Sequence, residues 1–135
     1  MNSTISLQDA LRAVDAALAH AEGAGAAVCV TVVDSGGNVL ALARMDGASF
    51  LTATLAENKA RTAAGLGMAT GDLAEFVGSN PLMLAAMTTQ PPVTVLPGGL
   101  PVPGGAVGVA GGTSGEDHPI AEAAAAALAA APVGA

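Results

Sequence analysis

The residue with the clearest potential for chemistry is Lys59, the single lysine of the chain. It lies in the middle of a predicted helix, between the small residues Ala56 and Ala60. A lysine in such a setting can act as a base, a Schiff-base amine or a clamp for an anion. The alternative is a lysine that carries its ammonium to the surface. Glu57 is a second candidate, although helix residues two apart point in different directions.

Arg44 and Asp46 form a second candidate pair, at the end of a predicted strand. Strand side chains alternate between faces, so residues two apart share a face. The two could form an ion pair, or the Arg44 guanidinium could hold a ligand carboxylate or propionate. The predicted catalytic residues are therefore Lys59, Arg44, Asp46 and Glu57.

A glycine-rich segment, Gly111-Gly112-Thr113-Ser114, precedes the last predicted helix. Free backbone N–H groups at a helix start favour binding of an anionic group. An ordinary helix start, capped by Thr113 or Ser114, is the alternative. The acidic residues and histidine of the adjacent run 116–118 do not have the spacing of a strong metal site. The candidate ligand-binding residues here are Gly111, Gly112, Thr113 and Asp117.

The charge of the chain excludes two classes of partner. The formal net charge is −7, and only four residues are basic: Arg12, Arg44, Lys59 and Arg61. Nucleic-acid binding normally depends on clustered Lys and Arg, and only two phenylalanines are available to stack on bases. We therefore expect neither nucleic acid nor an anionic membrane as a partner.

The hydrophobic residues predict a cytoplasmic homo-oligomer. No stretch reaches the roughly 18 strongly apolar residues of a spanning helix, and residues 1–5 lack the features of a signal peptide. Cys29 is the only cysteine and lies in an apolar run, where a buried thiol is expected. The chain is 52% hydrophobic, but much of this is alanine, which buries little area. A thin core and an apolar, small-residue surface favour association with further copies.

The first half of the chain predicts two helices around a hairpin. Ser6 is a suitable N-cap for a helix ending at residues 23–25, and a stripe of apolar residues should face the core. This stripe is Leu7, Leu11, Val14 and Leu18. Strands over 26–33 and 39–44 should flank a turn at 34–38, with Asp34 capping that turn. A second helix over 49–66 should place Leu51, Leu55, Lys59 and Thr62 on one side.

The second half predicts short helices, two more strands and a final helix. The short helices begin at residues 70 and 79–81, and the strands cover 93–96 and 106–110. The segment 98–101 follows the first of these strands, and a turn falls at 103–105. The last helix spans about 117–131, with Pro119 in its first turn. The whole, residues 1–135, is predicted to be one α+β domain, with helices packed on an antiparallel sheet of four to five strands.

Four blocks of the sequence resemble one protein family. The segments 32–38 and 43–48 are similar to the first hairpin of the GlcG/HbpS-type family, often labelled haem-degrading. Glu57-Asn58-Lys59-Ala60-Arg61-Thr62-Ala63 is similar to its second-helix signature. Gly98-Gly99-Leu100-Pro101 and 108–113, followed by Glu116-Asp117 and Ala121, match its C-terminal half. The blocks fall in the family's order and span nearly the whole chain. The C-terminal domain of PduO-type proteins is also similar.

The resemblance implies a profilin-like α+β fold and a homo-oligomer. It also implies haem, or a related tetrapyrrole, as a possible cofactor, and adds Gly99 and Pro101 to the candidate ligand-binding residues. His20 and His118 are then candidate axial ligands, because imidazole commonly ligates haem iron. A fold alone does not determine a function.

Three hypotheses remain open. The first is an oligomeric protein that binds haem or another tetrapyrrole between subunits and promotes its breakdown. The second is an enzyme without a redox cofactor, of the lyase or isomerase type, in which Lys59 transfers a proton or acts as an electrophile on a small anionic metabolite. The third is a non-catalytic accessory subunit.

Overall fold

The computed structural model describes residues 4–112 and 114–130. The elements are α1 Leu7–Gly23, β1 Cys29–Asp34, β2 Val39–Arg44, α2 Leu51–Leu66, α3 Thr70–Gly78, α4 Pro81–Thr88, β3 Gly99–Val102, β4 Gly105–Ala110 and α5 Ser114–Ala129. The order of helices and strands agrees with the prediction, and the α+β class is confirmed.

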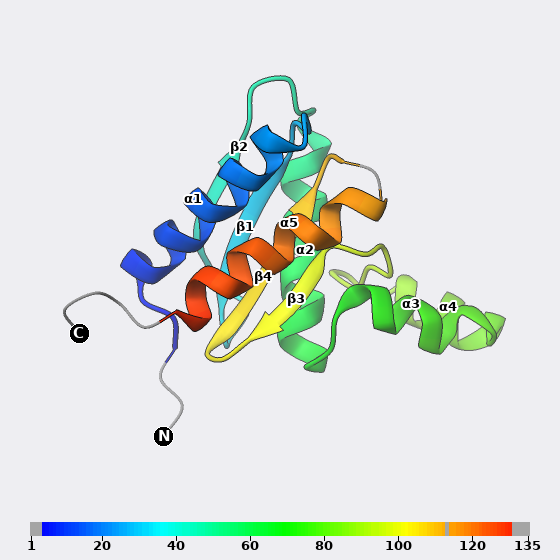
Figure 1. The fold of residues 1–135 in the computed structure, drawn as a ribbon. Coiled ribbons are helices and arrows are strands. Elements are labelled where there is room, and N and C mark those ends of the chain that lie inside the picture. Colours follow the sequence, from blue (N-terminus) through cyan, green and yellow to red (C-terminus); the bar gives the residue numbers. More distant parts are fainter. Residues whose placement is uncertain (1–3, 113, 131–135) are drawn as a thin grey trace.

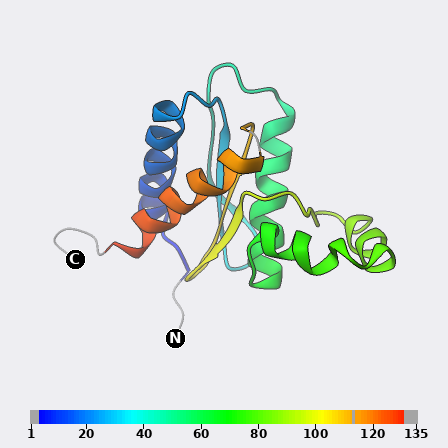
Figure 2. The ribbon, with the colours of Figure 1, turned by 45° about the vertical axis from the view of Figure 1, so that its right-hand side comes forward.

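The four strands form one antiparallel sheet in the order β2-β1-β4-β3. Helices α1 and α5 cover one face of this sheet and α2 covers the other (Figures 1 and 2). Alternation along β1 sends Val30 and Val32 toward α1 and α5, whereas Val33 packs against α2. The two central strands are therefore covered on both faces, which explains their nearly continuous apolar sequences.

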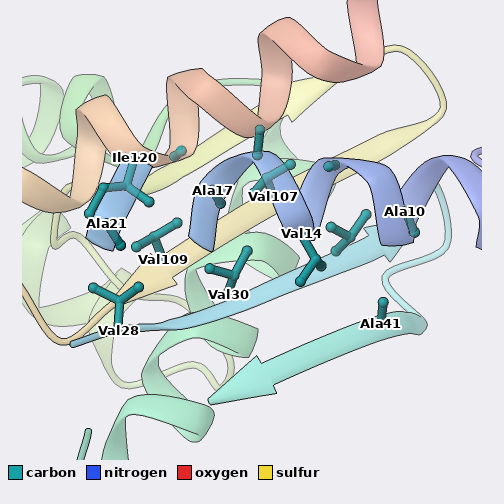
Figure 3. Packing of buried hydrophobic residues seen from close by; sticks show 14 of the residues in the cluster. Ala10, Val14, Ala17, Ala21, Val28, Val30, Ala41, Val107, Val109 and Ile120 are labelled. Carbon is teal, nitrogen blue, oxygen red and sulfur yellow. The ribbon is translucent and has the colours of Figure 1, made fainter. Parts of the chain in front are cut away.

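The core beneath α1 is built from small residues. The buried residues of α1 are Ala10, Ala13, Val14, Ala17 and Ala21. Figure 3 shows four of them, Ala10, Val14, Ala17 and Ala21, close to the valines of β1 and β4. Leu7 and Leu11 are 55% and 49% exposed, so the prediction that they face the core is wrong. Short side chains let the helix backbone lie close to the sheet, and of the predicted stripe only Val14 is buried and Leu18 packs partly buried against the core.

Helix α2, on the other face of the sheet, likewise exposes leucines and buries mainly small residues. The buried residues of this helix are Thr52, Ala56, Lys59, Ala60, Thr62 and Ala63. A Cβ atom added to Gly108 of β4 would overlap the Ala56 carbonyl oxygen and lie 2.6 Å from the Ala60 nitrogen. Leu51 and Leu55 point outward instead, 55% and 36% exposed. By helical spacing the four predicted residues Leu51, Leu55, Lys59 and Thr62 do lie along one side of α2, but only Lys59 and Thr62 are buried.

The third strand lies at Gly99–Val102 rather than at the predicted 93–96. Side-chain hydroxyl groups hold the predicted segment in place of a strand ladder. The Thr94 nitrogen donates to Thr62 Oγ1 at 3.1 Å, and Thr70 Oγ1 donates to the Leu96 carbonyl at 2.6 Å. The observed strand contains Pro101, which is tolerated because β3 lies at the edge of the sheet.

Among the other local predictions the Ser6 cap is confirmed, whereas β1 begins at Cys29 rather than at the predicted 26. The Ser6 side chain caps α1 by accepting from the Asp9 nitrogen, and Asn80 caps α4 in the same way through the Met83 nitrogen. Helix α5 begins at Ser114, earlier than the predicted 117. Pro119 consequently lies inside the helix rather than in its first turn.

Helices α3 and α4 extend away from the sheet and its covering helices (Figures 1 and 2). Between them and the end of α2 lies an apolar cavity of 260 Å³, lined by Leu66, Met68, Leu73, Phe76, Val77, Met83 and Met87. Three of the methionines thus line a cavity instead of filling a closed core.

The Cys29 thiol is fully buried between β1 and α2, and burial raises its pKa. A protonated, inaccessible thiol reacts slowly, because the thiolate is the nucleophile. We expect Cys29 to resist Ellman's reagent at pH 8 in the native protein. It should react completely in guanidinium at about 6 M, which unfolds most domains. Rapid labelling of the native protein would contradict this placement.

The Asp34 carboxylate stabilises the β1–β2 turn. Its Oδ1 accepts hydrogen bonds from the Asn38 and Gly36 nitrogens, both at 2.9 Å. The hydrogen bond from the Asn38 backbone, and a further one from Gly36, lower the pKa of Asp34 by favouring the ionised form. The folded-state pKa is below the unfolded one, so this stabilisation is present above the unfolded pKa. It is lost as pH falls through the folded pKa.

An Asp34→Asn variant should therefore unfold at a lower temperature than the parent at pH 7. The amide keeps an acceptor oxygen but carries no charge, so the difference should shrink as pH falls below about 4. Thermal unfolding followed by circular dichroism between pH 3 and 7 tests this. Asp46→Asn, at an exposed position just after β2, is the matched control. A pH-independent difference at position 34 would count against a role for the charge.

Candidate functional site

A cavity of 430 Å³ lies at one end of the sheet, where three connections meet. These are the segments between α1 and β1, between β2 and α2, and between β4 and α5. The lining residues are Gly25, Ala26, Ala27, Gly47, Ala48, Ser49, Thr52, Gly111, Gly112 and Glu116. The volume falls within the roughly 300–1,000 Å³ of small-molecule sites.

The walls of this cavity are mostly backbone and small side chains. Gly111 has φ +121, and a Cβ atom there would lie 2.6 Å from the Ala27 carbonyl oxygen. Only glycine lets the end of β4 pass this close to the chain entering β1. Ser49, Thr52 and Glu116 supply the polar side chains, and Thr52 Oγ1 donates to the Ser49 carbonyl at 2.7 Å. The site therefore offers mainly backbone groups, hydroxyls and one carboxylate.

A buried ion pair lies next to the cavity. Lys59 Nζ is 3.1 Å from Asp117 Oδ2, and the two side chains are 3% and 5% exposed. The same ammonium donates to the Val109 carbonyl at 2.8 Å. The other oxygen of Asp117 accepts from the Gly112 nitrogen at 2.9 Å, and Gly112 lines the cavity. The pair thus joins α2, β4 and α5 and holds one wall of the cavity.

Two glycines at the start of β3 let its backbone lie directly against the ion pair and the α2 backbone. A Cβ atom on Gly98 would lie 3.1 Å from Lys59 Nζ and 3.1 Å from the Asp117 Cβ. A Cβ atom on Gly99 would overlap the Lys59 carbonyl oxygen. The Gly99 nitrogen donates to Thr70 Oγ1 at 2.9 Å. In this structure Gly99, a predicted ligand-binding residue, is buried against α2 and α3.

Three of the predicted catalytic residues are separate from this pair. Arg44 donates to the carbonyl of Ala48, a cavity residue, at 2.6 Å. The ion pairs among residues 4–112 and 114–130 do not include one between Arg44 and Asp46, which is exposed. Glu57 is half-buried on α2 and makes no hydrogen bond or ion pair with the described part of the chain. Catalytic roles for Lys59, Arg44, Asp46 and Glu57 stay predictions.

The remaining predicted residues are dispersed. Pro101 pairs with Ala106 in the edge strand, and Thr113 lies outside the described residues. His20 is exposed in the last turn of α1, and His118 Nε2 is 3.7 Å from Glu122 Oε2 in α5. Wherever side chains are described, no three His, Cys, Asp or Glu residues come together in a way that could hold a metal ion.

Several residues of the site could not be identified from sequence. Asp117 is predicted to bind a ligand, but its partner Lys59 is 58 residues away, and no spacing rule connects the two. Ser49 and Thr52 have the pattern of an ordinary helix start. Gly98 has the pattern of a turn residue, although its role depends on the ammonium beside it.

None of the described helices is long and apolar enough to cross a membrane.

The fold and the cavity define a small α+β protein whose four-stranded antiparallel sheet lies between helices and carries a loop-lined pocket at one end. Within that class, the chain belongs to the family of HbpS-like haem-degrading proteins. The family model described as "Haem degrading protein HbpS-like" matches residues 5–126. The resemblance inferred from the four sequence blocks is thereby confirmed.

Comparisons of this chain with individual proteins agree with the family assignment. The chain is 36% identical over 126 residues to an uncharacterised 15.0 kDa protein of Citrobacter freundii, with 89% of each chain covered. Protein ORFY of Klebsiella pneumoniae has a similar crystal structure, with TM-score 0.87, 32% identity and coverage of 98% of this chain and 95% of that one. A double mutant of HbpS from Streptomyces reticuli gives TM-score 0.85 at 34% identity, covering 95% of this chain and 89% of that one.

Proposed function

We propose that this protein binds haem, or a related tetrapyrrole, at the cavity end of the sheet and does so as a homo-oligomer. The observation that carries the proposal is an apolar rim beside the cavity. Phe50 and Leu51 are 79% and 55% exposed and lie in sequence between the cavity residues Ser49 and Thr52. A flat, apolar macrocycle needs contact with large apolar side chains, and the small residues of the cavity walls do not supply them.

The residues present fit an open site shared between surfaces rather than a closed pocket. The cavity would admit one edge of the macrocycle, and Phe50 and Leu51 would contact its face. Arg44, hydrogen-bonded to the cavity residue Ala48, is the cation available for a propionate. Glu116 also lines the cavity and would disfavour a second propionate there.

Two imidazoles lie on the helices that border this end of the sheet. His20 is in the last turn of α1, which leads into the cavity residue Gly25, and His118 follows the cavity residue Glu116 in α5. Either imidazole would serve as an axial ligand. Haem, when bound, supplies the redox chemistry of its iron. The protein's part is to orient the macrocycle and limit the access of water.

The comparisons support this assignment. A solved structure described as a PduOC:heme complex resembles this chain with TM-score 0.81 and 29% identity, covering 92% of this chain and 94% of that one. The matching family model is described as haem-degrading. Breakdown of the bound tetrapyrrole is part of our proposal and follows that description.

Association of copies is supported by the outward leucines. Leu51, Leu55 and Leu66 of α2 are 55%, 36% and 45% exposed, on a helix whose inner face is small and polar. A surface helix of a monomer normally shows the opposite arrangement. A partner covering this face would also enclose the apolar rim, and so complete the proposed site.

Titration of the purified protein with haemin, followed by visible absorbance, tests binding. We expect a saturable Soret shift at one haemin per chain. One of the two single variants, His20→Ala or His118→Ala, should lose this shift, and the other should keep it. Phe50→Ser should weaken binding at least about tenfold, because it removes the most exposed apolar contact. Non-saturable binding that neither histidine variant changes would overturn the proposal.

The oligomer is tested separately by sedimentation velocity. The Leu51→Glu/Leu55→Glu variant should sediment as a monomer while keeping the native far-ultraviolet circular dichroism spectrum. The matched control is Leu7→Glu/Leu11→Glu, which changes two leucines of comparable exposure on α1, on the other face of the sheet. Dissociation of both variants, or of neither, would contradict an interface on α2.

A further inference from the structure

A second cavity, of 230 Å³, lies at the other end of α2. It is lined by Arg61, Ala64 and Gly65 of α2, by the β1–β2 turn residues 35–37, and by Pro92. Thr52 and Gly65 are about 20 Å apart along the helix, at 1.5 Å per residue. This cavity is therefore distinct from the proposed haem site.

Among the lysine and arginine side chains, Arg61 is the one that the described structure leaves without a partner. Arg12 pairs with Asp9 at 3.1 Å, Lys59 pairs with Asp117, and Arg44 donates to a carbonyl. The guanidinium of Arg61 makes no hydrogen bond or ion pair within residues 4–112 and 114–130. The unpaired guanidinium instead lines a cavity.

The other walls of this cavity are neutral and small. A Cβ atom on Gly37 would lie 3.7 Å from Arg61 Nε, which places the guanidinium against the turn. Glycine at 36, 37 and 65 lets a ligand approach the backbone closely. Asp34, the nearest acidic residue in sequence to that turn, has both oxygens hydrogen-bonded within the turn itself.

We propose that the Arg61 cavity binds the carboxylate of a small organic monoacid. The guanidinium fork matches a carboxylate in two parallel hydrogen bonds. A volume of 230 Å³ equals about eight waters at roughly 30 Å³ each, enough for a carboxylate with a short chain. The ionised Asp34 at the start of the turn favours a singly charged ligand over a doubly charged phosphate.

Titration with acetate, monitored by two-dimensional ¹⁵N NMR at constant ionic strength, tests the proposal. Saturable shifts are expected at the Gly36, Gly37 and Gly65 amides, with a millimolar dissociation constant. Arg61→Met should weaken binding at least about tenfold, whereas Arg12→Met should not change it. Shifts that do not saturate, or that persist in Arg61→Met, would overturn the proposal. Inorganic phosphate binding more tightly than acetate would overturn the carboxylate assignment.

A second variant tests the cavity without removing the charge. Gly65 lines the cavity and has no heavy atom within 4 Å of an added Cβ, so the side chain of Gly65→Leu can start there without a clash and should occupy part of the cavity. Acetate binding should be lost in this variant although Arg61 remains. Unchanged binding would exclude the cavity as the site. Haemin binding should be the same in Arg61→Met as in the parent, so failure of one proposal is distinguishable from failure of the other.

Discussion

Gly108→Ala should destabilise the protein strongly, although it adds only one methyl group to the sheet. The added carbon would overlap the Ala56 carbonyl oxygen and lie 2.6 Å from the Ala60 nitrogen. Both are helix backbone atoms, so no side-chain rotation can relieve the contact. Helix α2 would have to move away from β4, exposing the valine and alanine core on that face. We expect a loss of at least about 3 kcal/mol in the free energy of unfolding, at the upper end of overpacking effects.

Urea unfolding followed by circular dichroism measures this loss. Gly65→Ala is the matched control, because the same methyl group in α2 meets no atom within 4 Å. There the change should be neutral or stabilising by up to about 1 kcal/mol, since alanine is the better helix former. Equal stabilities for the two variants would show that α2 does not lie as close to β4 as described here.

Lys59→Met should be the most damaging change to a charged side chain. It leaves the Asp117 carboxylate, 5% exposed, without its cation. Removing one partner of a buried ion pair costs about 3–5 kcal/mol, because the remaining charge stays buried and uncompensated. Urea unfolding at pH 7 should show this loss.

The double variant Lys59→Met/Asp117→Asn separates the charge from the packing. Asparagine can still accept from the Gly112 nitrogen, and neither side chain is charged. The double variant should be more stable than Lys59→Met alone. A single variant within about 0.5 kcal/mol of the parent would contradict the buried pair. Lys59→Met lowers stability, so a loss of activity in that variant could reflect unfolding. The double variant is therefore the better one in which to test Lys59 for catalysis.

Local features of the fold were predictable because their causes lie within a few residues. The Ser6 cap of α1, the Asn80 cap of α4 and the Asp34 turn each depend on a side chain bonding backbone two to four residues away. The order of helices and strands follows from the same local signals. The family could be recognised because its glycine-rich blocks and helix signature are contiguous segments.

The inward face of each helix could not be predicted from hydrophobicity. Leucine at residues 7, 11, 51 and 55 is more apolar than alanine, yet it points outward. The deciding factor is the distance between helix and sheet, which Gly108 sets on one face. Where the backbones are this close, the buried positions are mostly Ala or Thr, and most of the leucines of these two helices are left at the surface.

The site depended on tertiary structure for the same reason. Sequence by itself determined the order of the elements, the antiparallel α+β class, the family and the residues whose side chains could do chemistry. Only the folded chain brought Lys59 to Asp117 across 58 residues, and left Arg61 facing a cavity. Tertiary hydrogen bonds also explain why the third strand is Gly99–Val102 and not the predicted 93–96, because hydroxyls of α2 and α3 bind the earlier segment. Pairing between distant residues is decided by which backbones can approach, and no spacing along the chain encodes that distance.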